Sequence, residues 1–304
     1  MVTAANAPKT ARKPGLAKGR RYLGSEIVFN IILFLFALAC LLPVIHIIAV
    51  SMSGREAVLS NRVVFIPINI DFTAYTSVFL DTTMQRSLIF SVILTVAFTA
   101  MAMFLTILLA YPLSKKRLPF GGFLMVLILI PMYFTGGTIP NYLWVKNMGL
   151  IDSPWSLILP CMTSTYNAII MRNFFSSIPE SLEESAHLDG CNDFQILIRI
   201  VLPLSTASLA TIALFYAVQR WNGFSDVRYY INSTKFFTLQ MKLYQLVFGA
   251  TDTQTNQVEG GRAAVLADTV KCASIVFSTV PILIVYPFLQ KYFVSGVMIG
   301  AVKE

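Results

Sequence analysis

Charged residues are scarce in this chain of 304 residues, in which they make up 12% and hydrophobic residues 56%. An ordinary soluble domain carries about 25% charged residues. The low charge therefore excludes that class and favours a membrane protein. The apolar runs are long and continuous, without the short alternating segments of a transmembrane barrel, so we expect an all-α fold.

Motifs for ATP hydrolysis and for common enzyme chemistry are also missing. The chain has no Gly-x4-Gly-Lys-Ser/Thr phosphate loop, no His-Glu-x-x-His and no Gly-x-Ser-x-Gly. Its few cysteines have no metal-ligand spacing, so neither a metal site nor a disulfide framework is expected. We expect no catalytic residue and no cofactor bound by this chain. The cysteines are Cys40, Cys161, Cys191 and Cys272.

Six uncharged runs have the length, or nearly the length, of about 20 residues that a helix needs to cross a bilayer. They predict a six-helix transmembrane domain over residues 27–290. Proline and glycine interrupt several runs, and Pro131 with Gly136-Gly137 predicts a kink in the third, beside a translocation path or as an ordinary helix kink. The runs are Ile27–Gly54, Ser87–Ser114, Leu118–Val145, Ser153–Met171, Ile200–Gln219 and Cys272–Gln290.

Basic residues set the expected orientation in a plasma membrane. One cluster precedes the first run and another follows the second, and both should stay in the cytoplasm. Residues 1–26 are then a basic cytoplasmic tail without a cleaved signal peptide, and residues 291–304 are a second cytoplasmic tail. Topology thus explains the net charge of +8 better than nucleic-acid binding does. The clusters are Lys9, Arg12, Lys13, Lys18, Arg20 and Arg21, and Lys115, Lys116 and Arg117.

The same alternation places a loop of residues 172–202 inside and the large loop of residues 220–271 outside. In the outer loop, Leu239–Val247 is expected to form a short amphipathic helix at the membrane surface. Gly249–Gly261 has the composition of a mobile loop, which either reaches toward an external partner or is a solvated linker.

The segment from Ile178 to Pro203 is the acid-rich interruption between the fourth and fifth runs. Ser177 and Glu180 have the spacing of a capping box, and Gly190 suits a helix end, so a short helix is predicted between them. Leu182, Ala186 and Leu188 are expected to share its apolar side. Such a helix fits a protein groove, although a plain loop folded over its own bundle is the alternative.

Within this segment, Glu184-Ser185-Ala186 is followed after three residues by Gly190, and after nine more by Ile200 and Leu202-Pro203. This spacing resembles the EAA motif of ABC importer permeases. Wider segments agree with the carbohydrate-uptake group, which includes the maltose transporter's permeases, and most with its subfamily for complex oligosaccharides, aldouronates and multiple sugars. They are Ile139–Leu143, Asn147–Asp152, Met171–Phe175, Gln290–Val294 and Gly296–Gly300.

The resemblance implies the type I importer (MetI-like) permease fold and a role in importing a sugar, expected to be an oligosaccharide. It implies a second homologous permease, two ATPase subunits that bind ATP and Mg²⁺, and an external sugar-binding protein. Ser185 departs from the usual Ala, a small change at a groove contact. The expected ATPase-coupling residues are Glu180, Glu183, Glu184, Ser185, Ala186, Leu188, Asp189 and Gly190.

Other roles are expected at three further places. Gly300 and Lys303 of the C-terminal tail are expected to contact the ATPases. Aromatic and amide side chains near the outer ends of the runs are candidates to line the sugar path, although interfacial Tyr and Trp occur in any membrane protein. The path candidates are Tyr133, Tyr142, Asn167, Tyr216 and Trp221, and the binding-protein candidates are Gly249, Thr251, Gly260 and Gly261.

A secondary transporter driven by an ion gradient is the alternative from another class. Such a protein needs acids or paired charges within the membrane. None of the six runs contains Asp, Glu, Lys or Arg, and the one histidine in them is His46. The runs therefore favour an ATP-driven permease.

Overall fold

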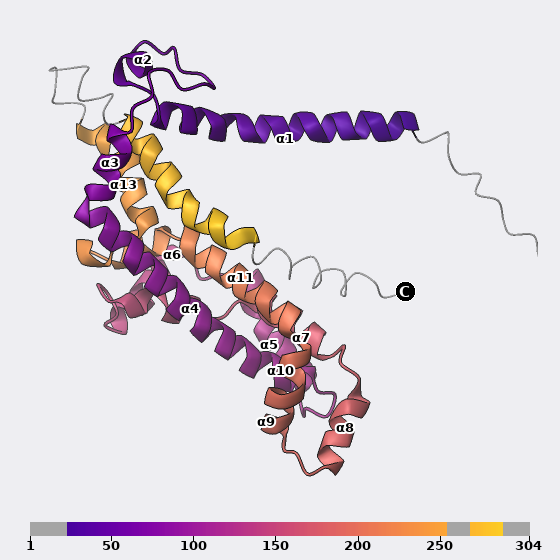
Figure 1. The fold of residues 1–304 in the computed structure, drawn as a ribbon. Helices are drawn as coiled ribbons and strands as arrows, with labels where there is room; N and C mark the ends of the chain where they lie inside the picture. Colours follow the sequence, from indigo (N-terminus) through magenta and orange to yellow (C-terminus); the bar gives the residue numbers. More distant parts are fainter. Residues whose placement is uncertain (1–22, 254–267, 288–304) are drawn as a thin grey trace, which may run out of the picture.

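The computed structural model describes residues 23–253 and 268–287, and nearly all regular structure in these ranges is helical. Apart from an isolated bridge between Ser53 and Ile70, the described residues form no strand. The expected all-α class is confirmed. Figure 1 shows an elongated bundle from which the first helix projects at one end.

Helix α1 (Leu23–Ser51) extends away from the rest of the chain, and its most apolar stretch buries no residue (Figure 1). Its C-terminal end packs, where Ala49 and Val50 meet Ala57 and Val63. These partners belong to or follow the short helix α2 (Arg55–Leu59). A long apolar helix that no other described residue covers needs a bilayer or another protein around it.

Helix α4 (Thr82–Ser114) is the axis of the bundle and packs against α7 (Thr165–Phe175) and α11 (Thr206–Asn222). Its buried residues recur every three or four positions, which places them on one face of a helix. The opposite face is apolar and exposed, as expected for a lipid or partner surface. The buried stripe comprises Ser87, Ser91, Leu94, Phe98, Ala102, Thr106 and Ala110.

The third predicted run is broken, as its glycines indicated. Helices α5 (Gly121–Tyr133) and α6 (Thr138–Asn147) meet at 112°. Gly137 lies at the break with φ +84°, a conformation that glycine adopts without steric cost. Pro131 sits inside α5, so the two glycines provide the turn.

The fourth predicted run is not one helix. It consists of the 3-10 turns η1 (Pro154–Leu157) and η2 (Leu159–Cys161) followed by α7, which has 11 residues. Pro160, inside the run, lacks an N–H and its ring disfavours a continuous helix. Within the described residues, three helices are long and apolar enough to cross a membrane, or up to five if each bent pair counts as one span.

The fifth run enters the bundle through a second sharp bend. The short elements α9 (Asp193–Ile196), η3 (Leu197–Val201, a π-turn) and α10 (Leu202–Leu204) meet α11 at 84°. The bend lies at Ser205, just after Pro203. The helix Asp268–Pro287, the last of the three single spans, closes the bundle near α11.

The remaining helices lie mostly at the end away from α8. Leu239 N–H donates to Ser91 Oγ at 2.7 Å, which packs α13 against α4. The predicted surface helix at Leu239–Val247 is therefore longer than expected and rests on the bundle, because its buried side finds apolar partners there. These helices are α3 (Thr73–Leu80), α12 (Ser225–Tyr230), η4 (Thr234–Phe236) and α13 (Leu239–Thr253).

Candidate functional site

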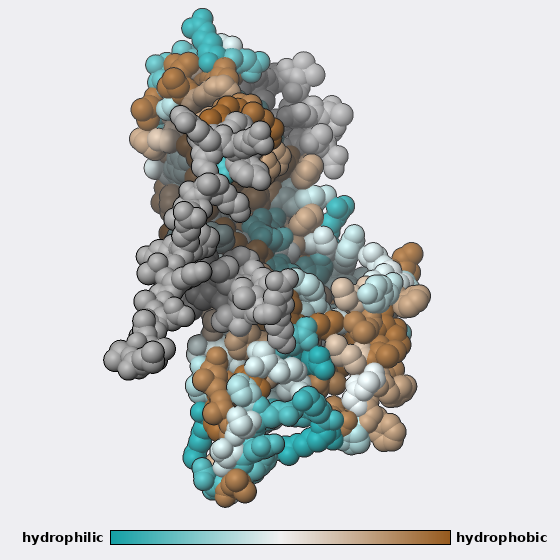
Figure 2. Space-filling model, turned by 90° about the vertical axis from the view of Figure 1, so that its right-hand side faces the viewer, coloured by the Kyte–Doolittle hydropathy of each residue, from teal (hydrophilic) through white to brown (hydrophobic). Residues whose placement is uncertain are grey.

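The predicted short helix is α8 (Glu180–Leu188), at the lower end of the molecule in Figure 1. Figure 2 shows hydrophilic residues gathered at this end. Pro179 is its N-cap and offers no side-chain cap, and Ser177 Oγ donates to Phe174 O at 2.6 Å. The predicted capping box is therefore wrong. Glu180 and Glu183 in the first turn favour the helix start through the dipole.

Helix α8 ends just before Gly190, as the sequence predicts. Gly190 has φ +83°, and its N–H donates to His187 O at 3.0 Å. Cys191 N–H then donates to Ala186 O at 2.9 Å. These bonds satisfy carbonyls that the helix end leaves open, and glycine allows them at no steric cost.

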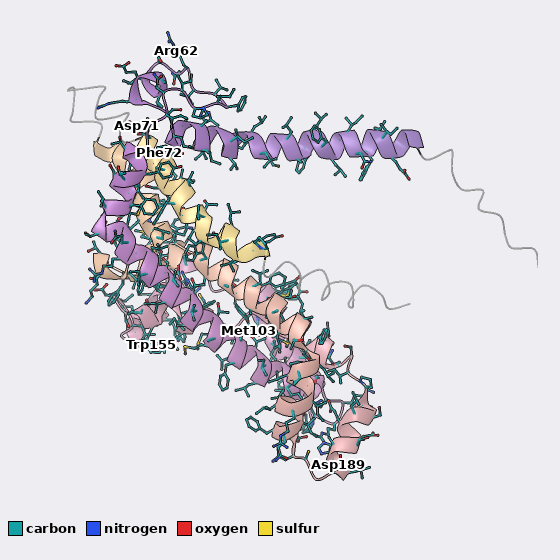
Figure 3. The ribbon with its side chains drawn as sticks, viewed as in Figure 1. Arg62, Asp71, Phe72, Met103, Trp155 and Asp189 are labelled. Carbon is teal, nitrogen blue, oxygen red and sulfur yellow. The ribbon has the colours of Figure 1, made fainter. Side chains whose placement is uncertain are left out.

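The two sides of α8 differ in what they contact. Ala186 is 6% exposed and belongs to the main core, whereas Leu188 is 90% exposed. The expectation that Leu188 shares a side with Ala186 is wrong, because residues two apart lie on nearly opposite sides of a helix. Glu184 and Ser185 are exposed, and Figure 3 shows Asp189 at the tip of the molecule.

Three consecutive basic residues after α4 each pair with an acid of the 172–202 loop. Lys115 pairs with Glu183, Lys116 Nζ lies 3.0 Å from Glu180 Oε1, and Arg117 pairs with Asp193. We call Lys115, Lys116 and Arg117 the basic triplet. The sequence identified these residues only as topology anchors, since nothing in the pattern shows which acids they meet.

The pairs of the basic triplet differ in burial. The Lys115 and Glu183 side chains are 14% and 13% exposed, and the Lys115 ammonium lies 4.3 Å from the centroid of the Tyr111 ring. The other two pairs are exposed, so solvent weakens them. The buried pair therefore dominates the attachment of α8 to α4.

Hydrogen bonds strengthen this attachment on both sides of α8. Arg172 Nε donates to Leu113 O at 3.1 Å, and Ser176 Oγ donates to Ser114 O at 3.3 Å. After α8, Tyr111 Oη donates to Asp193 O at 3.2 Å. The loop is thus fastened to the last turn of α4 before and after its helix.

The predicted path residues are mostly interior in this conformation. Tyr216 is fully buried, with its hydroxyl 2.7 Å from Thr106 Oγ1, and it accepts from Ser164 N–H at 3.2 Å. Asn167 and Trp221 are also buried, and Trp221 Nε1 donates to Ser278 O at 3.4 Å. The Tyr216 hydroxyl thus joins α11 to α4 and to the start of α7, and the Trp221 indole joins α11 to the helix Asp268–Pro287.

The other two path candidates lie nearer the surface. Tyr133 is 73% exposed at the break between α5 and α6. Tyr142 is half-buried and stacks on Tyr230, with centroids 6.3 Å apart. The five candidates thus differ in burial, from the fully buried Tyr216 to the exposed Tyr133, and their role in a sugar path stays a prediction.

A buried ion pair lies one residue beyond the fifth predicted run. Arg220 is 5% exposed, pairs with Asp226 and donates to Leu157 O at 3.0 Å. Sequence reasoning missed it because the uncharged run ends at Gln219. The two charges neutralise each other and tie α11, α12 and η1 together, which is a structural role.

The remaining predicted positions fall at the edge of the described residues or outside them. Gly249 and Thr251 belong to α13, so the first residues of the expected mobile loop are helical. Gly260, Gly261, Gly300 and Lys303 lie outside the described residues. Within the described ranges, no group of three His, Cys, Asp or Glu residues could hold a metal ion.

Comparison with known proteins shows the family to which this bundle and loop belong. Residues 88–299 match the family described as the binding-protein-dependent transport system inner membrane component. The chain belongs to this family. The match includes the 172–202 loop and the bundle around α4, and it confirms the predicted permease fold and a multi-pass location in the plasma membrane.

Individual relatives agree with the family. The chain is 45% identical to a polygalacturonan/rhamnogalacturonan transport system permease protein of Bacillus subtilis, over 89% of this chain and 95% of that one. It is 44% identical to protein LplC of the same organism, over 91% and 95%. Among solved structures it is similar to a chain of a bacterial ABC transporter involved in importing the acidic polysaccharide alginate, with TM-score 0.82, 34% identity and coverage of 92% and 100%.

Proposed function

We propose that this permease is a subunit of an ATP-driven importer that brings an oligosaccharide into the cytoplasm. The family match supports a transport role, and the names of the similar proteins support a sugar cargo. The observation that carries the coupling role is the two-sided α8. Its inner side is fastened to α4, while Leu188 and Glu184 project outward from the chain.

In the proposed cycle, an ATPase subunit grips the outward side of α8 from the cytoplasm. Partner subunits bind ATP and Mg²⁺, because this chain has no phosphate loop. Closure of the ATPase pair moves α8, and the basic triplet transmits that movement to α4. A second permease completes the pore, an external binding protein delivers the sugar, and both termini lie in the cytoplasm.

The other coupling positions divide between the two sides of α8. Ser185 and Asp189 lie on exposed positions and complete the proposed ATPase contact. Glu180, Glu183, Ala186 and Gly190 act within this chain: they fasten, pack or end the helix. The tail residues Gly300 and Lys303 and the loop residues Gly260 and Gly261 remain proposed contacts with the ATPases and the binding protein.

The test uses the whole transporter, with both permeases, the ATPases and the binding protein, reconstituted in vesicles. Leu188→Ser should lower ATP-driven uptake of radiolabelled oligosaccharide at least tenfold, because it removes the apolar anchor from an interface. Leu59→Ser changes a leucine of α2 that is 46% exposed and should leave uptake unchanged. Wild-type uptake by Leu188→Ser, in correctly assembled complexes, would contradict the coupling role.

A further inference from the structure

Positive charges gather at the end of α4 opposite to α8. Arg86 of α4 lines two adjoining pockets, one of about 460 Å³ shared with Lys235 and one of about 410 Å³ shared with Lys242. Within residues 23–253 and 268–287, none of these three side chains forms an ion pair or a hydrogen bond. We call Arg86, Lys235 and Lys242 the outer cation cluster.

The outer cation cluster and the basic triplet lie at opposite ends of α4. Helix α4 has 33 residues and therefore extends about 50 Å from the cluster to the basic triplet. If the triplet lies in the cytoplasm, the cluster lies at the outer surface, where the positive-inside rule gives no reason for extra Lys and Arg. A cluster of like charges is also unfavourable on its own, so it fits an anionic ligand.

The acid closest to Arg86 in the sequence, Asp81, is already engaged. Asp81 accepts hydrogen bonds from Thr83 N–H at 2.7 Å and from Met84 N–H at 3.4 Å, as the cap of α4. Lys242 stabilises its charge, and the Lys235 and Lys242 ammonium groups also lie over the rings of Phe236 and Phe237. Arg86 has no such partner among the described residues, so its guanidinium is available to a ligand.

The other lining residues suit a sugar. Thr82, Thr83 and Thr234 bring hydroxyl groups to the pocket of Lys242. In the other pocket, Phe90 and Phe236 lie with ring centroids 5.8 Å apart, which offers an apolar face for a pyranose ring. Each pocket has the size of ordinary small-ligand sites.

We propose that the outer cation cluster binds the carboxylate of an acidic sugar, a uronate unit of the imported oligosaccharide. Arginine suits this ligand because its planar guanidinium donates two parallel hydrogen bonds to one carboxylate. The proposal rests on the proposed function for the transport step and adds a charge preference to it. It assigns Arg86 as the primary contact, with the two lysines beside it.

The first experiment measures binding without transport. The full chain in neutral phosphatidylcholine nanodiscs is titrated calorimetrically with trigalacturonate and with its fully methyl-esterified form. We expect the acid to bind at least tenfold more tightly than the ester, because a hydrogen bond to a charged group gives about that factor. Equal binding of acid and ester, or equally tight binding of inorganic phosphate, would overturn the proposal.

Variants then locate the site. Arg86→Gln should weaken trigalacturonate binding about tenfold and leave the ester unchanged, whereas Arg86→Lys should restore part of it. Lys146→Gln, an exposed lysine at the end of α6, is the matched control and should bind normally. Equal affinities for Arg86→Gln and Lys146→Gln overturn the site. Because Arg86 is exposed, a thermal scan should show both variants folded.

Uptake by the reconstituted transporter separates this inference from the proposed function. Suppose that the transporter imports a neutral oligosaccharide with ATP and that Arg86→Gln changes the uptake of no sugar. This result would support the proposed import function and overturn the uronate site. A complex that hydrolyses ATP but imports no oligosaccharide would instead overturn the proposed function. Binding of trigalacturonate that depends on Arg86 would still support the uronate site in that case.

Discussion

The ammonium group of Lys115 lies against the carboxylate of Glu183, and both side chains are close to nine-tenths buried. Exposed ion pairs contribute at most about 1 kcal/mol, but removing one member of a buried pair leaves an uncompensated charge and costs more. This pair joins α8 to the last turn of α4. It is therefore the contact that a moving α8 would pull on.

Glu183→Gln should lower the free energy of unfolding by roughly 1–3 kcal/mol, between the values for exposed and fully buried pairs. It should also raise the number of ATP molecules hydrolysed per sugar imported, because α8 is then less firmly attached to α4. Glu180→Gln is the control, because the Lys116–Glu180 pair is exposed. Equal ratios of ATP to sugar in both variants would contradict the transmission of movement through Lys115.

The end of α8 gives a second prediction. A Cβ added to Gly190 meets no atom within 4 Å, so the cost of substitution lies in the backbone at φ +83°. Gly190→Ala should therefore lower the free energy of unfolding by about 1–2 kcal/mol. Gly190→Asn should cost less, because asparagine tolerates this conformation.

Gly249→Ala is the matched control for this prediction. Gly249 lies within α13, and an added Cβ also meets no atom there. In a helical backbone, alanine is favoured over glycine by about 1 kcal/mol. Thermal unfolding in detergent should show opposite signs for the two alanine variants. Stabilisation by both would show that Gly190 is not held in the left-handed conformation.

The sequence predicts elements well where a local rule decides them. Gly190 ends α8 and Gly137 breaks the third run because both sit at positive φ, a preference that glycine carries in any fold. The buried stripe of α4 likewise follows from helical spacing. The EAA-type spacing from Glu184 to Pro203 located the loop that the family match includes.

Contacts across long sequence separations escape such rules. The basic triplet satisfies the positive-inside rule without any partner, so the acids that it meets in the folded chain could not be predicted. The burial of the aromatic residues chosen for a sugar path could not be predicted for a similar reason: Tyr216 suits a binding surface and a hydrogen-bonded core equally well. Only the packing of α11 against α4 decides between them.

The Arg220–Asp226 pair gives a third prediction. Asp226→Ala leaves the guanidinium buried with Leu157 O and Gly223 O as its remaining partners, and should lower the free energy of unfolding by about 3–5 kcal/mol. Asp226→Asn retains hydrogen-bonding atoms and should cost less. Chemical unfolding in detergent measures both. The double variant Arg220→Met with Asp226→Leu removes both charges and should recover much of the free energy of unfolding that Asp226→Ala loses. A double variant whose loss equals the sum of the two single-variant losses would contradict the pairing.

The cap of α4 predicts a dependence on pH. Partial burial of Asp81 favours the neutral acid, but hydrogen bonds from Thr83 and Met84, with the charge of Lys242, outweigh burial and hold the pKa below its usual 3.8. Because the pKa is lower in the folded state, this stabilisation is present above the unfolded pKa. It is lost as the pH falls through the folded pKa.

Two variants separate the charge of Asp81 from its capping bonds. Asp81→Asn caps about as well but cannot titrate, so the advantage of the wild type over it should shrink as the pH falls below about 3.8. Asp81→Ala loses the cap and should be less stable than Asp81→Asn by about 1 kcal/mol at every pH. Unfolding in detergent between about pH 6 and pH 3 measures both differences. A wild-type advantage over Asp81→Asn that stays constant or grows with acid would show that the folded chain does not favour the ionised carboxylate.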